Sequence, residues 1–80
     1  MLEYNYNDFL TDLKMGREFE FVIDNQTYNI SIADRLYIFS FKGESIAYKS
    51  IELLTENLRI QGKDIKTIFE SGKIEDYTIY

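Results

Sequence analysis

The feature that most constrains the fold is an alternation of apolar and polar side chains in two neighbouring stretches, residues 17–24 and 27–32. Successive side chains of an extended strand point to opposite faces, so this alternation predicts strands with one buried and one solvated face. The residues between the two stretches, Asp24-Asn25-Gln26, are of types that favour turns. We therefore expect an antiparallel hairpin. Its inward side chains are Phe19, Phe21, Ile23, Tyr28, Ile30 and Ile32.

Three further stretches have the character of strands. Residues 35–42 are apolar on both faces, which is typical of a strand covered on both sides or of one that exposes an aromatic patch. A turn at Gly43-Glu44-Ser45 precedes residues 46–48, which could form a short fourth strand. The final segment, residues 73–80, alternates enough to be a last strand, although a frayed terminus is the alternative reading.

Apolar residues at helical spacing predict three helices, over residues 6–15, 51–58 and 65–71. Each prediction has a residue suited to cap its start, namely Asn5, Ser50 and Asp64. Gly16 and Gly72 can end the first and third helices in a left-handed turn. The buried stripes are expected to contain Tyr6, Phe9, Leu10, Leu13, Ile51, Leu54, Leu58, Ile65, Ile68 and Phe69.

Together these elements predict the order α-β-β-β-(β)-α-α-(β), an α+β fold with a single antiparallel sheet of three to five strands and three helices against it. The 80 residues are enough for one domain, spanning residues 1–80, with one compact core. The N-terminal stretch lacks the basic and apolar regions of a signal peptide, and no window is apolar for long enough to span a bilayer. We expect a cytoplasmic protein with no membrane association.

The residue types available argue against catalysis. The chain has no histidine and no cysteine, which removes the commonest general base, the soft metal ligands and the thiol nucleophile. The absence of cysteine also fits a reducing compartment. The glycines follow no phosphate-loop spacing, and the acidic pairs lack the spacing of a calcium loop. We therefore predict that the protein is not an enzyme and uses no cofactor and no metal.

Charge is distributed unevenly along the chain. Residues 1–34 contain seven acids and two bases, whereas residues 35–80 contain seven of each, so the first part carries the whole net charge of -5. Contacts to phosphate need lysine and arginine, so this balance argues against direct binding of nucleic acid. It favours a basic partner instead.

The acidic residues of the first helix and the hairpin are the candidate partner-binding site: Asp8, Asp12, Glu18, Glu20 and Asp24. One interpretation is a solvated face that keeps a small domain soluble. The other is a surface that docks on lysine and arginine, or imitates a phosphate backbone, and so occupies a basic cleft that normally holds DNA or RNA.

Aromatic residues provide a second set of interface candidates. Tyr37 and Phe39 lie in the expected third strand, and Tyr77 and Tyr80 lie near the C-terminus. Tyrosine is enriched at binding hot spots, but tyrosines in strands are more often core-edge residues with solvated hydroxyls. The alternative function is therefore a structural or regulatory protein, for example a homodimer, that associates through strand aromatics or a free sheet edge.

Several runs resemble small uncharacterised α+β proteins of Gram-positive bacteria and of their phages and mobile elements. These runs are residues 8–10, 16–21, 28–31, 50–57 and 60–69, at core and cap positions. The tail from Lys73 to Tyr80 departs from that group. The architecture and acidity are also similar to some type II anti-CRISPR proteins, small domains that occupy the DNA-binding surface of a nuclease. That resemblance implies a CRISPR nuclease as one basic partner, and it is a likeness of topology and charge without a shared motif.

Overall fold

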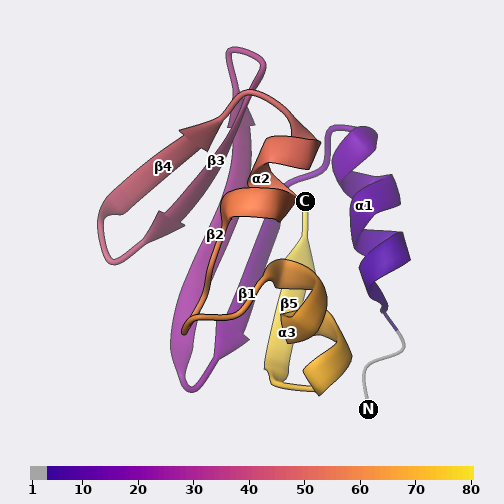
Figure 1. Ribbon diagram of the computed structural model, residues 1–80, viewed down its shortest axis with the longest axis vertical. Coiled ribbons are helices and arrows are strands. Elements are labelled where there is room, and N and C mark those ends of the chain that lie inside the picture. Colours follow the sequence, from indigo (N-terminus) through magenta and orange to yellow (C-terminus); the bar gives the residue numbers. More distant parts are fainter. Residues whose placement is uncertain (1–3) are drawn as a thin grey trace.

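A computed structural model of the protein describes residues 4–80 and confirms the α+β class and the predicted order of elements. Five strands form one antiparallel sheet, and three helices accompany it (Figure 1). The elements are α1 (Tyr6–Lys14), β1 (Phe19–Ile23), β2 (Gln26–Ala33), β3 (Leu36–Phe41), β4 (Glu44–Tyr48), α2 (Ile51–Asn57), α3 (Ile65–Ser71) and β5 (Ile74–Ile79). No helix among these residues is long and apolar enough to cross a bilayer.

The order of strands across the sheet is β4-β3-β2-β1-β5, so the C-terminal strand lies beside the first strand and not beside the fourth. The last segment is an ordered strand, which settles the alternatives that its sequence left open. Phe19 pairs with Ile79, and Phe21 pairs with Tyr77. The register shifts between Val22 and Ile23, where the ladder between β1 and β5 is irregular.

Each of the three hairpins turns on two residues that adopt positive φ. They are Asp24-Asn25, Asp34-Arg35 and Lys42-Gly43. Turns of this kind have a twist that matches the flanking strands. Arg35 and Lys42 were therefore wrongly included in the predicted third strand, and the turn predicted at residues 43–45 lies one position earlier, so that β4 begins at Glu44.

The helices begin at the predicted caps. Asn5 accepts a hydrogen bond from the backbone N–H of Asp8, whose side chain accepts one from the N–H of Asn5. Ser50 accepts from Leu53, and Asp64 accepts from Thr67. The hydroxyl and N–H of Thr67 hold the pKa of Asp64 below its ordinary value.

The helix ends differ slightly from the prediction. The first helix stops at Lys14, because Met15 is its C-cap, and Gly16 follows with φ of 86°. The second stops at Asn57, because Leu58 has an extended backbone and is buried beyond the helix. The third ends at Ser71, and Gly72 adopts the left-handed conformation.

One core lies between the helices and one face of the sheet. The ring of Phe9 on α1 lies 4.9 Å from the ring of Phe19 on β1 and 4.9 Å from that of Phe69 on α3. A row of rings, Tyr28 with Phe21 and Phe41, continues across the neighbouring strands. The fully buried positions include Phe9, Leu13, Ile23, Ile30, Leu54, Leu58, Ile65 and Ile68.

The opposite face of the sheet has no helix over it in residues 4–80. Side chains alternate along each strand, so the neighbours of the buried residues point to this second face. They are exposed or half-buried. The small neutral residues among them are Thr27, Asn29, Ser31, Ala33, Ser40, Ser45, Ala47 and Thr78, and the larger apolar ones are Val22, Leu36 and Ile38. In Figure 1 the β3–β4 hairpin also extends away from the three helices.

The burial of α2 yields a test with an internal control. Leu54 is fully buried, whereas its neighbour Leu53 is 42% exposed. Leu54→Ala should lower the free energy of unfolding by about 2–5 kcal/mol, because it removes buried contacts and leaves a cavity. Leu53→Ala should lower it by less than about 1 kcal/mol. Urea denaturation followed by circular dichroism measures both values, and equal losses would contradict the assigned packing of α2.

Candidate functional site

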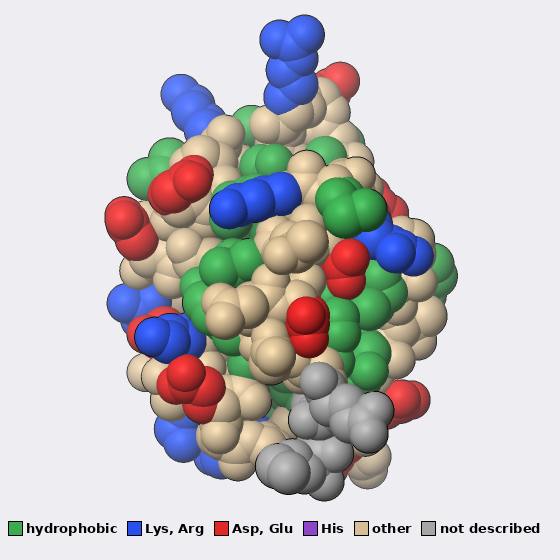
Figure 2. All heavy atoms as spheres, turned by 90° about the vertical axis from the view of Figure 1, so that its right-hand side faces the viewer, with side chains coloured by type: hydrophobic (Ala, Val, Ile, Leu, Met, Phe, Trp, Pro, Cys, Tyr) green, Lys and Arg blue, Asp and Glu red, His purple; other side chains and the backbone are tan. Residues whose placement is uncertain are grey.

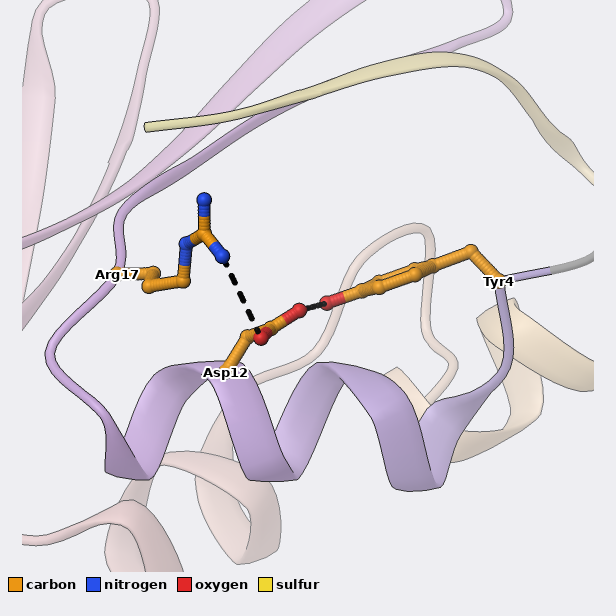
Figure 3. Close-up of polar contacts among 3 residues, drawn as sticks. All are labelled: Tyr4, Asp12 and Arg17. Atoms are coloured by element: carbon orange, nitrogen blue, oxygen red, sulfur yellow. Dashed lines mark hydrogen bonds and ion pairs between the residues drawn. The ribbon is translucent and has the colours of Figure 1, made fainter.

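The two candidate acids of α1 have roles within the domain. Asp8 belongs to the N-terminal cap of the helix. The side chain of Asp12 is 19% exposed, and its carboxylate accepts a hydrogen bond from the hydroxyl of Tyr4 at 2.6 Å. The guanidinium of Arg17 lies 4.0 Å from the other carboxylate oxygen (Figure 3). Asp12 therefore ties the segment before α1 to the segment after it.

Tyr4 is the partner of Asp12 that the sequence did not single out. Its ring stacks on Tyr77 of β5 with the centroids 5.0 Å apart, and it also approaches Phe19 and Phe69. Burial raises the pKa of the Tyr4 phenol above its ordinary value, and the hydrogen bond to Asp12 raises it further. The phenol therefore stays protonated and continues to donate to Asp12 well into the alkaline range.

Glu18 and Asp24 also accept hydrogen bonds from the chain itself. The carboxylate of Glu18, just before β1, accepts from the backbone N–H of Ile32 at 2.9 Å. Asp24 lies in the β1–β2 turn, and its carboxylate accepts from the side-chain amide of Gln61 at 2.8 Å. These two acids therefore hold loops and strand ends in place.

Glu20 differs from the other four candidates. It lies in β1 between Phe19 and Phe21, both of which face the core, so its side chain points to the open face of the sheet. Phe19 contacts α1 through Phe9, so Glu20 and α1 lie on opposite sides of the sheet. The five candidate acids are thus distributed over the helix layer, the hairpin end and the open face.

The open face carries a second acid, Asp76, that the sequence reasoning did not select. Asp76 lies opposite Val22 in the pairing of β5 with β1, and Glu20 lies opposite Thr78. The two carboxylate side chains are therefore diagonal neighbours on this face, a relation with a typical spacing of roughly 7–8 Å. The alternation of residues in the tail could have suggested that Asp76 points away from the core. It could not have shown that Asp76 lies near Glu20, because that depends on the order of the strands in the sheet.

The strands contain no lysine and no arginine, although the chain has nine such residues. All nine lie in helices, turns or connecting loops. Two of them, Lys63 and Lys73, lie close enough together that Lys73 lowers the pKa of Lys63. By contrast, four strand residues are acidic: Glu20, Glu44, Glu75 and Asp76. The strands of the sheet therefore carry negatively charged side chains but no positively charged ones.

The side of the molecule that bears α1 has no comparable separation of charge. Figure 2 shows acidic and basic side chains interspersed with hydrophobic ones on this side. Among residues 4–80 the pair of Arg17 and Asp12 is the one ion pair, and at 4.0 Å it is long. Most charged side chains of the described residues are therefore solvated and not paired with each other.

The aromatic candidates differ in how accessible they are. Phe39 is 8% exposed and belongs to the core, and Tyr37 is half-buried against it. Tyr77 is partly exposed but is stacked on Tyr4. Tyr80, at 63% exposure, is the most accessible of the four.

A shallow groove of about 460 Å³ lies between the start of α1 and α3, lined by Asn5, Tyr6, Asn7, Lys66, Phe69 and Glu70. Its polar groups are the amides of Asn5 and Asn7, the hydroxyl of Tyr6, the ammonium of Lys66 and the carboxylate of Glu70. Among residues 4–80 no group of three or more acidic side chains is placed to hold a metal ion.

Comparisons of the chain with protein-family models, curated proteins and solved structures give no match.

The contact between Tyr4 and Asp12 predicts a measurable loss of stability. Tyr4→Phe keeps the stacked ring but removes the hydroxyl, which leaves a mostly buried carboxylate oxygen without its donor. The free energy of unfolding should fall by roughly 1–3 kcal/mol. The control is Tyr80→Phe, which removes a hydroxyl from an exposed tyrosine and should change stability by less than about 0.5 kcal/mol. Urea denaturation at neutral pH measures both, and equal effects would contradict the role assigned to Tyr4.

The raised pKa of Tyr4 predicts a dependence of stability on alkaline pH. In the unfolded chain a tyrosine ionises near pH 10, whereas folded Tyr4 keeps its proton at that pH. Its contribution to stability is therefore complete below about pH 10 and is lost as the pH rises above that value. The free energy of unfolding should fall less steeply above pH 10 in Tyr4→Phe than in the Tyr80→Phe control. Parallel curves for the two variants would refute the prediction.

Proposed function

We propose that this protein is a small binding module that recognises a basic partner protein through the open face of its sheet, with Glu20 and Asp76 as the charged contacts. The observation that carries the proposal is the exclusion of lysine and arginine from all five strands. Glu20 and Asp76 make this face negative, and no strand lysine or arginine offsets that charge. A negative surface attracts a basic partner and repels an acidic one, which favours both rate of association and specificity.

The arrangement of the two acids supports this choice of surface. Glu20 and Asp76 are diagonal neighbours, so their like charges repel each other in the free domain. Glu20 has no hydrogen-bond or ion-pair partner among those found in residues 4–80, and the Asp76 carboxylate accepts one hydrogen bond, from the N–H of the next residue, Tyr77. A lysine or arginine of the partner would relieve that repulsion without breaking a contact within the domain, apart from the short bond from the Tyr77 N–H to Asp76.

The neutral residues around the acids suit a protein partner. Threonine, serine and asparagine side chains surround Glu20, and half-buried Val22 and Ile38 lie in the same face. A mixture of apolar and hydrogen-bonding groups on a flat surface is typical of non-obligate protein interfaces. Asp8, Asp12, Glu18 and Asp24 would then serve mainly the fold.

The finer part of the proposal concerns the partner. An acidic sheet face would occupy a basic surface that normally holds DNA or RNA, such as that of a CRISPR nuclease. The resemblance of topology and charge to type II anti-CRISPR proteins supports this partner class. In this reading the domain inhibits by covering the surface and does not itself bind nucleic acid.

A pair of charge-reversal variants tests the proposal. Glu20→Lys with Asp76→Lys should abolish capture of the partner from host lysate at low salt, because the two attractive contacts become repulsive. Glu52→Lys with Glu56→Lys changes the net charge equally, but on exposed positions of α2, and should retain capture. Quantitative mass spectrometry of the captured proteins measures both, with circular dichroism to confirm that each variant is folded.

Two further outcomes decide the proposal and its finer part. Equal capture by the two double variants would reject the open face as the binding surface. Duplex DNA added to the captured complex should displace the partner if the occupied surface is one that binds nucleic acid. If duplex DNA does not displace the partner, the protein would still be a binding module, but the proposal that it inhibits a nucleic-acid-handling enzyme would be rejected.

A further inference from the structure

The outer edge of β4 is the feature that carries a further inference. β4 is one of the two edge strands of the sheet, and in Figure 1 it forms the left-hand border with no other element beyond it. A sheet edge presents unpaired N–H and C=O groups that can pair with another strand. Four of its five residues are exposed, including Ile46 at 54%.

The hydrogen-bonding groups on this edge follow from the β3–β4 hairpin. A two-residue turn closes on a hydrogen-bonded pair, here Phe41 with Glu44, and such pairs alternate with non-hydrogen-bonded pairs along the ladder. The N–H and C=O groups of Glu44, Ile46 and Tyr48 therefore point toward β3. Those of Ser45 and Ala47 point outward and lack a strand partner.

The two edges of the sheet differ in how well they are protected. Natural edge strands are guarded by charges, by proline or by bulges. The other edge, β5, has an irregular register with β1 and the consecutive acids Glu75 and Asp76. β4 contains no lysine, arginine or proline, its pairing with β3 is regular, and its one charge is Glu44 at the end. Nothing in β4 therefore opposes the addition of a strand.

We infer that a second copy of this chain pairs with β4, edge to edge and antiparallel about a twofold axis through Ile46, so that the two sheets become one continuous sheet. In this register Ser45 of each copy faces Ala47 of the other, and both of these outward-pointing pairs exchange two hydrogen bonds. The surface is self-complementary, which is the condition that a twofold interface requires.

Two properties of β4 favour this register over its neighbours. Centring the pair on Ile46 places the two exposed isoleucine side chains against each other at a non-hydrogen-bonded position, where side chains approach closely. It also separates the two Glu44 residues by four positions, roughly 13 Å along the strand. That distance exceeds the Debye length of about 8 Å at physiological ionic strength, so the like charges are screened. A register centred on Ser45 would bring these carboxylates twice as close.

The proposed dimer uses a different surface from the proposed partner-binding face, so dimer formation does not depend on the proposed function. β4 lies at the opposite edge of the sheet from β5, which carries Asp76. A pairing of five-residue strands buries little area, so we expect a weak dimer that forms at high protein concentration.

The absence of cysteine makes a direct test possible, because one introduced cysteine can react only with its counterpart in another copy. Ile46→Cys places the two thiols at directly opposed positions in the proposed dimer, within reach of a disulfide. The matched control is Tyr80→Cys, at a site that is exposed to a similar degree but lies past the end of β5. Under mild oxidation, Ile46→Cys should form covalent dimer at least about tenfold faster, as resolved on non-reducing gels; equal rates would overturn the inference.

Charge variants test the register. In the Ile46→Cys background, lysines placed at both positions 45 and 47 put like charges directly opposite each other, and glutamates at both positions do the same. Each variant alone should lose the fast cross-linking, and an equimolar mixture should recover it as the mixed dimer. Persistent cross-linking of either variant alone, or failure of the mixture to recover it, would reject pairing about Ile46. Circular dichroism checks that the substituted edge strands remain folded.

Discussion

The fold depends on the contact of Phe9 with Phe19 and Phe69. These three rings join the consecutive elements α1 and β1 to α3, which is distant in the sequence, and each pair of rings in contact contributes about 1 kcal/mol beyond simple burial. β1 lies between β2 and β5, so fixing it under the helices also fixes the covered face of the sheet. The surfaces available to a partner are therefore the ones that this packing leaves uncovered.

That packing is uneven, and the unevenness creates both candidate surfaces. Three short helices bury one face of the strands around β1, while the other face and the outer edge of β4 stay open. The composition of the strands compensates, because the open face mixes small polar residues and two acids with the half-buried apolar residues Val22, Leu36 and Ile38.

The acidic residues illustrate how the same residue type can serve the fold or a surface. Asp12, Glu18 and Asp24 each accept a hydrogen bond from a residue distant in the sequence. The sequence identified all three as acids of one segment, but it could not reveal their donors, because hydrogen bonds between distant residues depend on the folded arrangement. Glu20 was predicted to point away from the core, and here the strand period was sufficient. Asp76 was missed because its relation to Glu20 exists only across two strands.

The sequence by itself determined the three helices, the first three strands, their order, the inward residues of β1 and the caps of the helices, because alternation, helical spacing and capping act over a few neighbouring residues. Only the tertiary structure decided that β5 pairs with β1, that Tyr4 donates to Asp12 and that β4 is left as a free edge. The physical reason is that strand order is set by which apolar faces close together into one core. That choice involves residues far apart in the chain, which no local pattern specifies.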